Sequence, residues 1–146
     1  MISSILSAML CITAIGHAQG EGERCQQSEE AVQAAVYGHI DAKGLKAVLD
    51  ARMPLVLLDG RGNNWHDGTI IPGAKLAWYE DSAEDFAKLI PNLDTLVVVY
   101  CYSFSCPLSP RLAQKLVDLG YRNVVEYAGG LSQWRDVAHY DVETIE

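Results

Sequence analysis

The sequence predicts an α/β domain with a mainly parallel central sheet flanked by helices. Two short apolar runs, 55–58 and 96–100, have the length and composition of strands covered on both faces. Stretches with helical periodicity and capping residues separate such runs, which is typical of parallel sheets. The chain has 146 residues, 49% of them apolar, and this suits a single hydrophobic core.

The expected elements follow one another along the chain. The first half holds a short helix over 29–37, a helix over 42–51 capped by Asp41, a strand at 55–58 and a Gly/Asn-rich loop over 60–68. The second half holds a helix from Ser82 to about 90, a strand at 96–100, a helix begun by Ser109 as N-cap and Pro110 and stopped by Gly120, a strand at 124–127 and a helical segment at 131–137. Helices and strands therefore alternate throughout.

The charge balance excludes one class of partner. Eleven Lys and Arg stand against nineteen Asp and Glu, which gives a formal net charge of −8 and an acidic pI. Nucleic acids and anionic membranes are bound by clustered Lys and Arg. We therefore expect no nucleic-acid partner.

The N-terminal segment has the composition of a secretory signal peptide. Residues 1–18 contain no Asp, Glu, Lys or Arg, and small residues at Gly16 and Ala18 suit cleavage after Ala18. The predicted organisation is a signal peptide at 1–18, a leader with a short helix at 19–38, the domain at 39–138 and a C-terminal tail at 139–146. The protein is expected to be exported, to the periplasm or outside the cell, or membrane-anchored if the segment is not cleaved.

Export affects how the cysteines are interpreted. Removal of Cys11 leaves Cys25, Cys101 and Cys106, an odd number in a compartment that favours disulfides. At least one thiol is then free or bonded to another molecule. The three cysteines and the scattered histidines have no metal-ligand spacing, so no metal site is expected.

Cys101 is the strongest candidate for chemistry. It directly follows the most apolar strand, and a helix begins eight residues later. Ligands of open α/β sheets bind at the carboxyl ends of strands, and loop amides beside a helix N-terminus stabilise a thiolate. From position alone, Cys101 is equally well explained as a small buried residue that finishes a strand.

Several motifs between residues 40 and 134 resemble those of rhodanese domains, a family of single-domain sulfurtransferases. The matching segments, in chain order, are Leu-Leu-Asp-Gly-Arg at 57–61, Gly68 with Ile-Pro-Gly-Ala at 71–74, Val-Val-Val-Tyr-Cys at 97–101, Leu-Gly-Tyr-Arg-Asn-Val at 119–124 and Gly-Gly-Leu-Ser-Gln-Trp at 129–134. Each is weak alone, but their shared order is specific.

The resemblance implies a rhodanese-like fold and a sulfurtransferase activity without a cofactor. Cys101 would take sulfane sulfur from a small sulfur-containing anion such as thiosulfate, or from a persulfide donor, and pass it to a thiol or other thiophilic acceptor. The backbone amides that would hold the persulfide and the donor belong to Tyr102, Ser103, Phe104, Ser105 and Cys106.

Asp59 and Arg61 are expected to pair and support the loop, as a structural ion pair or as a catalytic part. Trp65 and His66 follow them in the loop, where they would contact substrate or simply be solvated. Trp134 is expected in the core.

The sequence also departs from the family's pattern. Phe104 replaces the usual Gly of the cysteine loop, which is about two residues longer than usual, and no basic residue lies between Cys101 and Pro110. Without a fixed cation, thiosulfate activity should be weak. Related phosphatases need Arg six residues after the cysteine, where this chain has Pro107, so phosphatase activity is not expected.

Cys106 leaves alternative functions open. It could resolve a Cys101 persulfide or sulfenate by forming a disulfide in the loop, or it could pack inward and never react. The chain would accordingly be a sulfurtransferase, a thiol–disulfide redox module that uses Cys101 and Cys106, or a non-catalytic binding module with this fold.

Overall fold

The structure of the protein is a computed structural model that describes residues 36–146. The expected signal peptide at 1–18 and most of the leader at 19–38 lie outside the described residues. Of the helix expected over 29–37, only Val36 and Tyr37 are described, and neither is helical.

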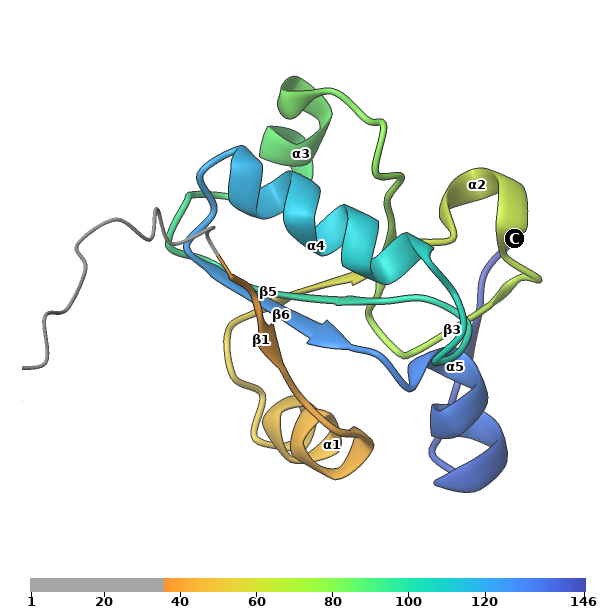
Figure 1. Cartoon of the computed structure of the whole chain (residues 1–146). Helices are drawn as coiled ribbons and strands as arrows, with labels where there is room; N and C mark the ends of the chain where they lie inside the picture. The colour runs from red at the N-terminus through yellow and green to blue at the C-terminus, as the bar shows by residue number, and fades with distance from the viewer. Residues whose placement is uncertain (1–35) are drawn as a thin grey trace, which may run out of the picture. The chain divides into compact units, whose positions relative to one another are not determined.

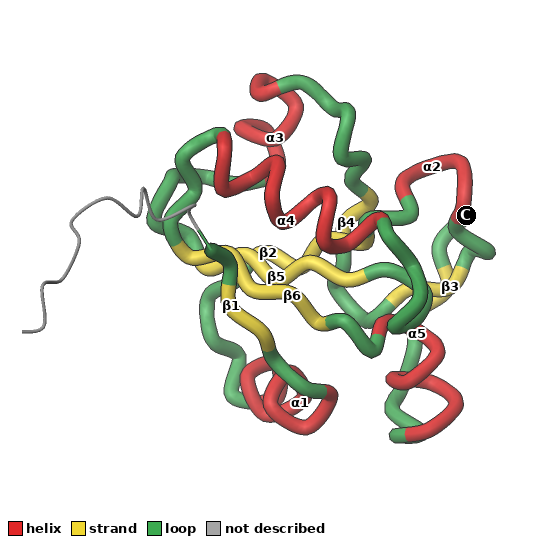
Figure 2. The backbone as a smooth tube through the Cα atoms, viewed as in Figure 1, coloured by secondary structure: helices red, strands yellow, loops and turns green. Residues whose placement is uncertain are grey.

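A sheet of five parallel strands forms the centre of the domain and confirms the predicted α/β fold (Figures 1 and 2). In spatial order the strands are β1 (Gly38–His39), β6 (Asn123–Tyr127), β5 (Leu96–Tyr100), β2 (Val56–Asp59) and β4 (Lys75–Leu76). In the middle of the sheet, Val98 of β5 pairs with Val125 of β6 and Leu57 of β2. The central strand is thus bonded on both edges, and it leads directly to Cys101.

Helices cover both faces of the sheet (Figure 1). The elements of one face are α3 (Ala83–Leu89) and α4 (Leu108–Asp118), and those of the other are α1 (Ala42–Asp50) and α5 (Gly130–Ser132), which continues as a π-helical turn, η1 (Gln133–Val137).

The residues of β5 alternate between the two layers, as the pleat of a strand requires. Val97 and Val99 pack in the cluster that contains Leu112 of α4. Val98 belongs to the opposite cluster, with Trp134 of η1. This confirms the prediction that Trp134 is a core residue, and it explains why the run 96–100 is apolar at every position.

Side chains cap two helices as predicted. A carboxylate oxygen of Asp41 accepts a hydrogen bond from the Gly44 amide at 2.7 Å. The Ser82 hydroxyl accepts one from the Asp85 amide at 3.2 Å. Each cap satisfies an amide that has no partner within its helix.

The start of α4 was predicted incorrectly. The helix begins at Leu108 and its N-cap is Pro107, so Ser109 lies inside the first turn. The Ser109 hydroxyl donates instead to Glu126 of β6, at 2.7 Å. A serine that has a buried acceptor on a neighbouring strand does not need to cap its own helix.

The stretch 60–68, expected to be a loop, contains one helical turn, α2 (Gly62–Trp65). Gly62 has a φ of +56°, and a side chain there would lie 3.3 Å from the Trp78 ring. The chain turns tightly at this point because glycine adopts positive φ values without penalty.

The C-terminal tail is attached to the domain. Strand β7 (Glu143–Thr144) pairs antiparallel with β3 (Thr69–Ile70), and the Glu143 carboxylate accepts a hydrogen bond from the Gly73 amide at 2.9 Å. The tail therefore fixes the segment that follows α2. Within residues 36–146, no helix has the length and apolar character needed to cross a bilayer.

Gly130 allows α5 to approach the loop that follows β5. Its φ is +63°, and a Cβ atom at this position would lie 2.5 Å from the Cys101 carbonyl oxygen and 2.7 Å from that of Tyr102. Those two oxygens accept hydrogen bonds from the amides of Leu131 and Ser132, at 3.0 and 2.8 Å. The close approach is therefore part of how the loop is held.

Substitution Gly130→Ala should lower the free energy of unfolding by about 3 kcal/mol, because it adds a backbone clash to an unfavourable φ. The matched control is Gly120→Ala. Gly120 has a φ of +92°, but no atom lies within 4 Å of the methyl group that this substitution adds. It should cost only about 1 kcal/mol. Urea denaturation of both variants provides the comparison, and equal losses would contradict the importance of the contact.

Candidate active site

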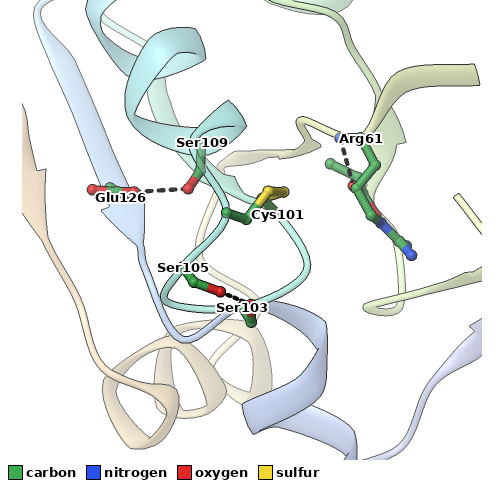
Figure 3. Close-up of a disulfide and its surroundings, with 8 residues drawn as sticks. Arg61, Cys101, Ser103, Ser105, Ser109 and Glu126 are labelled. Atoms are coloured by element: carbon green, nitrogen blue, oxygen red, sulfur yellow. Dashed lines mark hydrogen bonds and ion pairs between the residues drawn. A yellow bond between two sulfur atoms is a disulfide. The ribbon is translucent and has the colours of Figure 1, made fainter. Parts of the chain in front are cut away.

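Cys101 lies at the carboxyl end of β5, where the chain leaves the sheet and turns toward α4 (Figure 3). Its side chain is 1% exposed. The carbonyl groups of Cys101 and Tyr102 are held by the first amides of α5, as described above. The start of the cysteine loop is therefore fixed by backbone contacts on the side away from α4.

The loop itself is mostly exposed. Phe104 is 71% exposed, and the Ser103 and Ser105 hydroxyls lie 3.2 Å apart. The Cys106 amide donates to the Ser103 carbonyl at 2.9 Å and closes a turn. In this form of the protein the Cys106 amide already has an acceptor. That the loop amides bind a persulfide therefore stays a prediction.

A disulfide joins Cys101 to Cys106 (Figure 3). Their Cα atoms are 6.3 Å apart, which lies within the range usual for disulfides. The two cysteines singled out from the sequence are thus brought together. The structure describes an oxidised form, in which neither sulfur is a free thiol.

The first turn of α4 is tied to the sheet by a buried acidic residue that the sequence analysis missed. Glu126 of β6 is largely buried; one carboxylate oxygen accepts the Ser109 hydrogen bond, and the other lies 3.5 Å from Nδ1 of His39 on β1. Because residues of a strand alternate in direction, Glu126 shares a face with Val124, which packs in the α4 layer. The alternation of residues along β6 was therefore the one feature of the sequence that could have indicated that Glu126 faces the α4 layer.

Asp59 and Arg61 form the predicted pair. The Arg61 guanidinium donates to both carboxylate oxygens of Asp59, at 2.7 to 3.2 Å, and the two residues are 2% and 0% exposed. The guanidinium also donates to the Thr69 carbonyl and, at 3.1 Å, to Asp67. The pair therefore holds the segment from 61 to 69, beside the cysteine loop rather than within it.

These contacts also affect acid–base behaviour. Burial alone would raise the pKa of Asp67, but hydrogen bonds from the Thr69 amide and from Arg61 lower it below the usual value. Burial, followed by the nearby Asp59 carboxylate, raises the pKa of Tyr100 far above its usual value. Tyr100 therefore stays neutral, and its hydroxyl accepts a hydrogen bond from the Ile71 amide at 3.0 Å.

Arg135 of η1 is a second residue that the sequence analysis missed. Its guanidinium binds Asp136 at 2.7 Å and lies 3.7 Å from Asp67. The Asp136 carboxylate above all, with a smaller contribution from the Tyr102 hydroxyl, raises the pKa of Arg135. A cation from another element thus lies beside the first residue of the loop. Only the packing of η1 brings it there, so no local signal could have revealed it.

A pocket of about 340 Å³ opens on the other side of the loop, bordered by Phe104, His39, Glu126 and Tyr127. The Tyr127 hydroxyl is buried and has no hydrogen-bond partner among residues 36–146. Burial above all raises its pKa to about 12, so it is a neutral donor.

The other candidates lie elsewhere or do not form a cluster. Trp65 of α2 is exposed, and Nδ1 of His66 accepts a hydrogen bond from the Gly68 amide at 3.1 Å. Cys25 lies outside the described residues. Among residues 36–146, no three His, Cys, Asp or Glu side chains are grouped so that they could hold a metal ion.

Substitution Asp59→Asn should destabilise the protein by about 3 kcal/mol, because it leaves the buried Arg61 guanidinium without its main counter-charge. The matched control is Asp94→Asn, which removes the carboxylate of the exposed pair between Asp94 and Arg122. It should change stability by no more than about 1 kcal/mol. Urea denaturation measures both, and a small effect at Asp59 would mean that the buried pair is replaceable.

Comparison with known proteins identifies the family. The model of the rhodanese-like domain matches residues 32–137. A thiosulfate sulfurtransferase from Pseudomonas aeruginosa is 25% identical with a TM-score of 0.62; the match covers 75% of this chain but only 21% of that one. A rhodanese-like domain from Anabaena has the same identity, TM-score and coverage of this chain, and 81% of it is covered.

A protein from Bacillus halodurans has the same fold, with a TM-score of 0.66 at 23% identity over 73% of this chain and 77% of that one. No curated protein matches the chain. The family model covers well over half of the sequence, and the parallel sheet flanked by helices agrees with it. The chain therefore belongs to the rhodanese-like domain family.

Proposed function

We propose that this protein is a sulfurtransferase that carries sulfane sulfur as a persulfide on Cys101. The observation that supports this most strongly is the position of Cys101, at the carboxyl end of the central strand in a rhodanese-like domain. The similarity to a thiosulfate sulfurtransferase agrees with the proposal. Its substrates would be a small sulfur-containing anion or a persulfide as donor, and a thiol as acceptor.

The reaction starts from the reduced loop. The Cys101 thiolate attacks the outer sulfur of the donor, and the donor's S–S bond breaks. With thiosulfate, sulfite leaves with the bonding electron pair, and the transferred sulfur remains on Cys101 as a persulfide. The thiolate and the persulfide are both anions, and free amides at the start of α4 favour negative charge there. A thiol acceptor then removes the outer sulfur.

The disulfide supports a second candidate, a thiol–disulfide redox module. With Cys101 bonded to Cys106, no sulfur can be accepted until a reductant opens the loop. A purely redox protein would use only this step. A sulfurtransferase would need it as activation. The two functions are distinguished by whether the reduced protein takes up sulfur.

The donor is expected to be held by few charges. The loop between Cys101 and Pro110 has no Lys or Arg, and the nearby Arg135 is already paired with Asp136. Thiosulfate is a compact dianion, so it should bind weakly. The pocket beside Phe104 borders the cysteine loop and offers a place for an acceptor.

We also propose that the protein is exported, since residues 1–18 lack charge and end in small residues. An oxidising compartment would favour the disulfide-bonded form. The activity would then depend on a local source of reducing equivalents.

Reduced protein that carries Cys106→Ser cannot form the loop disulfide; incubated with thiosulfate, it should gain one sulfur atom by intact mass, and cyanide should release it as thiocyanate. Adding Cys101→Ala to this variant should abolish both signals, because it removes the nucleophile. Adding Cys25→Ser instead, which removes a cysteine outside the described residues, should leave both signals unchanged. If reduced protein takes up no sulfur from thiosulfate or from a persulfide, Cys101 is not a sulfur carrier.

Substitution Phe104→Arg should raise kcat/KM for thiosulfate by about tenfold, because a cation in the loop lowers the free energy of the bound dianion. Met53→Arg is the matched control. It adds the same charge at an exposed position before β2, at the amino ends of the strands. Steady-state thiocyanate formation measures both variants, each made on the Cys106→Ser protein so that the loop disulfide cannot form. If the two respond alike, the gain comes from net charge and not from the loop.

A further inference from the structure

We propose that Cys106 resolves the Cys101 persulfide, so that the protein releases the transferred sulfur as hydrogen sulfide and ends the step with the Cys101–Cys106 disulfide. This rests on the proposed function, because it begins from a Cys101 persulfide. It adds an activity: the thiol-dependent conversion of sulfane sulfur to sulfide.

The geometry of the loop supports attack on the inner sulfur of the persulfide. In a Cys101 persulfide, the inner sulfur is Sγ of Cys101 and the outer sulfur is the transferred atom. In the structure, Sγ of Cys106 is bonded to Sγ of Cys101 while β5 extends to Tyr100 and α4 begins at Leu108. Cys106 follows Cys101 by only five positions, so the second thiol is present at a high effective concentration.

The step balances without an added oxidant. The Cys106 thiolate attacks Sγ of Cys101, a new S–S bond forms, and the bond between Cys101 and the outer sulfur breaks. The outer sulfur leaves with the electron pair and is protonated to hydrosulfide. The sulfane sulfur is reduced to sulfide, and the two cysteine thiols are oxidised to the disulfide. With thiosulfate as donor, the products of the two steps are sulfite, sulfide and the oxidised loop.

Turnover then requires an external thiol or dithiol reductant, and burial indicates where it attacks. Cys101 is 1% exposed in the disulfide form, whereas Cys106 is partly exposed and lies in the open part of the loop. An incoming thiolate can therefore reach Sγ of Cys106 and expel Cys101 as the leaving group. This order returns Cys101 as a thiolate and places the mixed disulfide on Cys106.

The test is a single turnover with the full chain, reduced and then freed of reductant. The donor is benzenethiosulfonate, because its leaving group, benzenesulfinate, is not a thiol and does not compete with Cys106. Sulfide, intact mass and the disulfide are measured together. The unaltered protein should release about one sulfide per chain and lose two hydrogens, with little persulfide left.

Two variants separate this inference from the proposed function. Cys106→Ser should accumulate the persulfide, release it to cyanide, and yield at least about tenfold less sulfide, since its hydroxyl is a poor nucleophile. A circular dichroism spectrum that matches that of the unaltered protein shows that this variant is folded. Cys25→Ser should match the unaltered protein, which would exclude the third cysteine of the exported chain as the resolving thiol.

The possible failures are distinguishable. Persulfide that accumulates on the unaltered protein without sulfide or disulfide would overturn the role of Cys106 and leave the sulfurtransferase intact. Equal sulfide from Cys106→Ser would also overturn it. No sulfur uptake by either protein would refute the proposed function itself. Finally, glutathione added to the oxidised protein should form a mixed disulfide with Cys106, which peptide mapping would locate. A glutathione adduct on Cys101 would overturn the order of reduction.

Discussion

Two backbone hydrogen bonds, from the amides of Leu131 and Ser132 to the carbonyls of Cys101 and Tyr102, hold the start of the cysteine loop. They can form only because Gly130 has no side chain and adopts a positive φ. Strand β5 brings Cys101 to the edge of the sheet, but this contact determines how the chain leaves that edge. Gly130 of the Gly-Gly motif therefore fixes the start of the cysteine loop, although some thirty positions separate it from Cys101 along the chain.

The disulfide and the proposed persulfide would each occupy the one bonding position that Sγ of Cys101 has beyond its Cβ atom. They therefore exclude each other on a single chain. A cysteine pair at this position does not argue against sulfur transfer; it adds a second partner for the same atom. Whether the disulfide is the resting state, the end of each turnover or both depends on how quickly reductant arrives compared with donor. The partial exposure of Cys106 makes that arrival possible.

The sequence was informative wherever local chemistry decides structure. The caps at Asp41 and Ser82, the apolar strand β5 and the buried Trp134 follow from hydrogen-bonding capacity and periodicity. It was misleading where a distant residue competes. Ser109 was predicted to cap its own helix because the sequence does not show that Glu126 lies beside it. Arg135 reaches the loop only through the packing of η1. The spacing suggested a Cys101–Cys106 disulfide as one alternative, but it could not decide between that disulfide and a Cys106 that never reacts.

The pairing of β7 with β3 means that the folding unit is longer than the family match. The match ends at residue 137. Beyond it, the Asp141 carbonyl accepts a hydrogen bond from the Trp134 indole, and the Glu143 carboxylate accepts one from the Gly73 amide. A shortened protein cut at the family boundary would lose both contacts and leave an edge of β3 open. Fragments chosen for crystallisation or as modules in fusion proteins should therefore extend through the last strand.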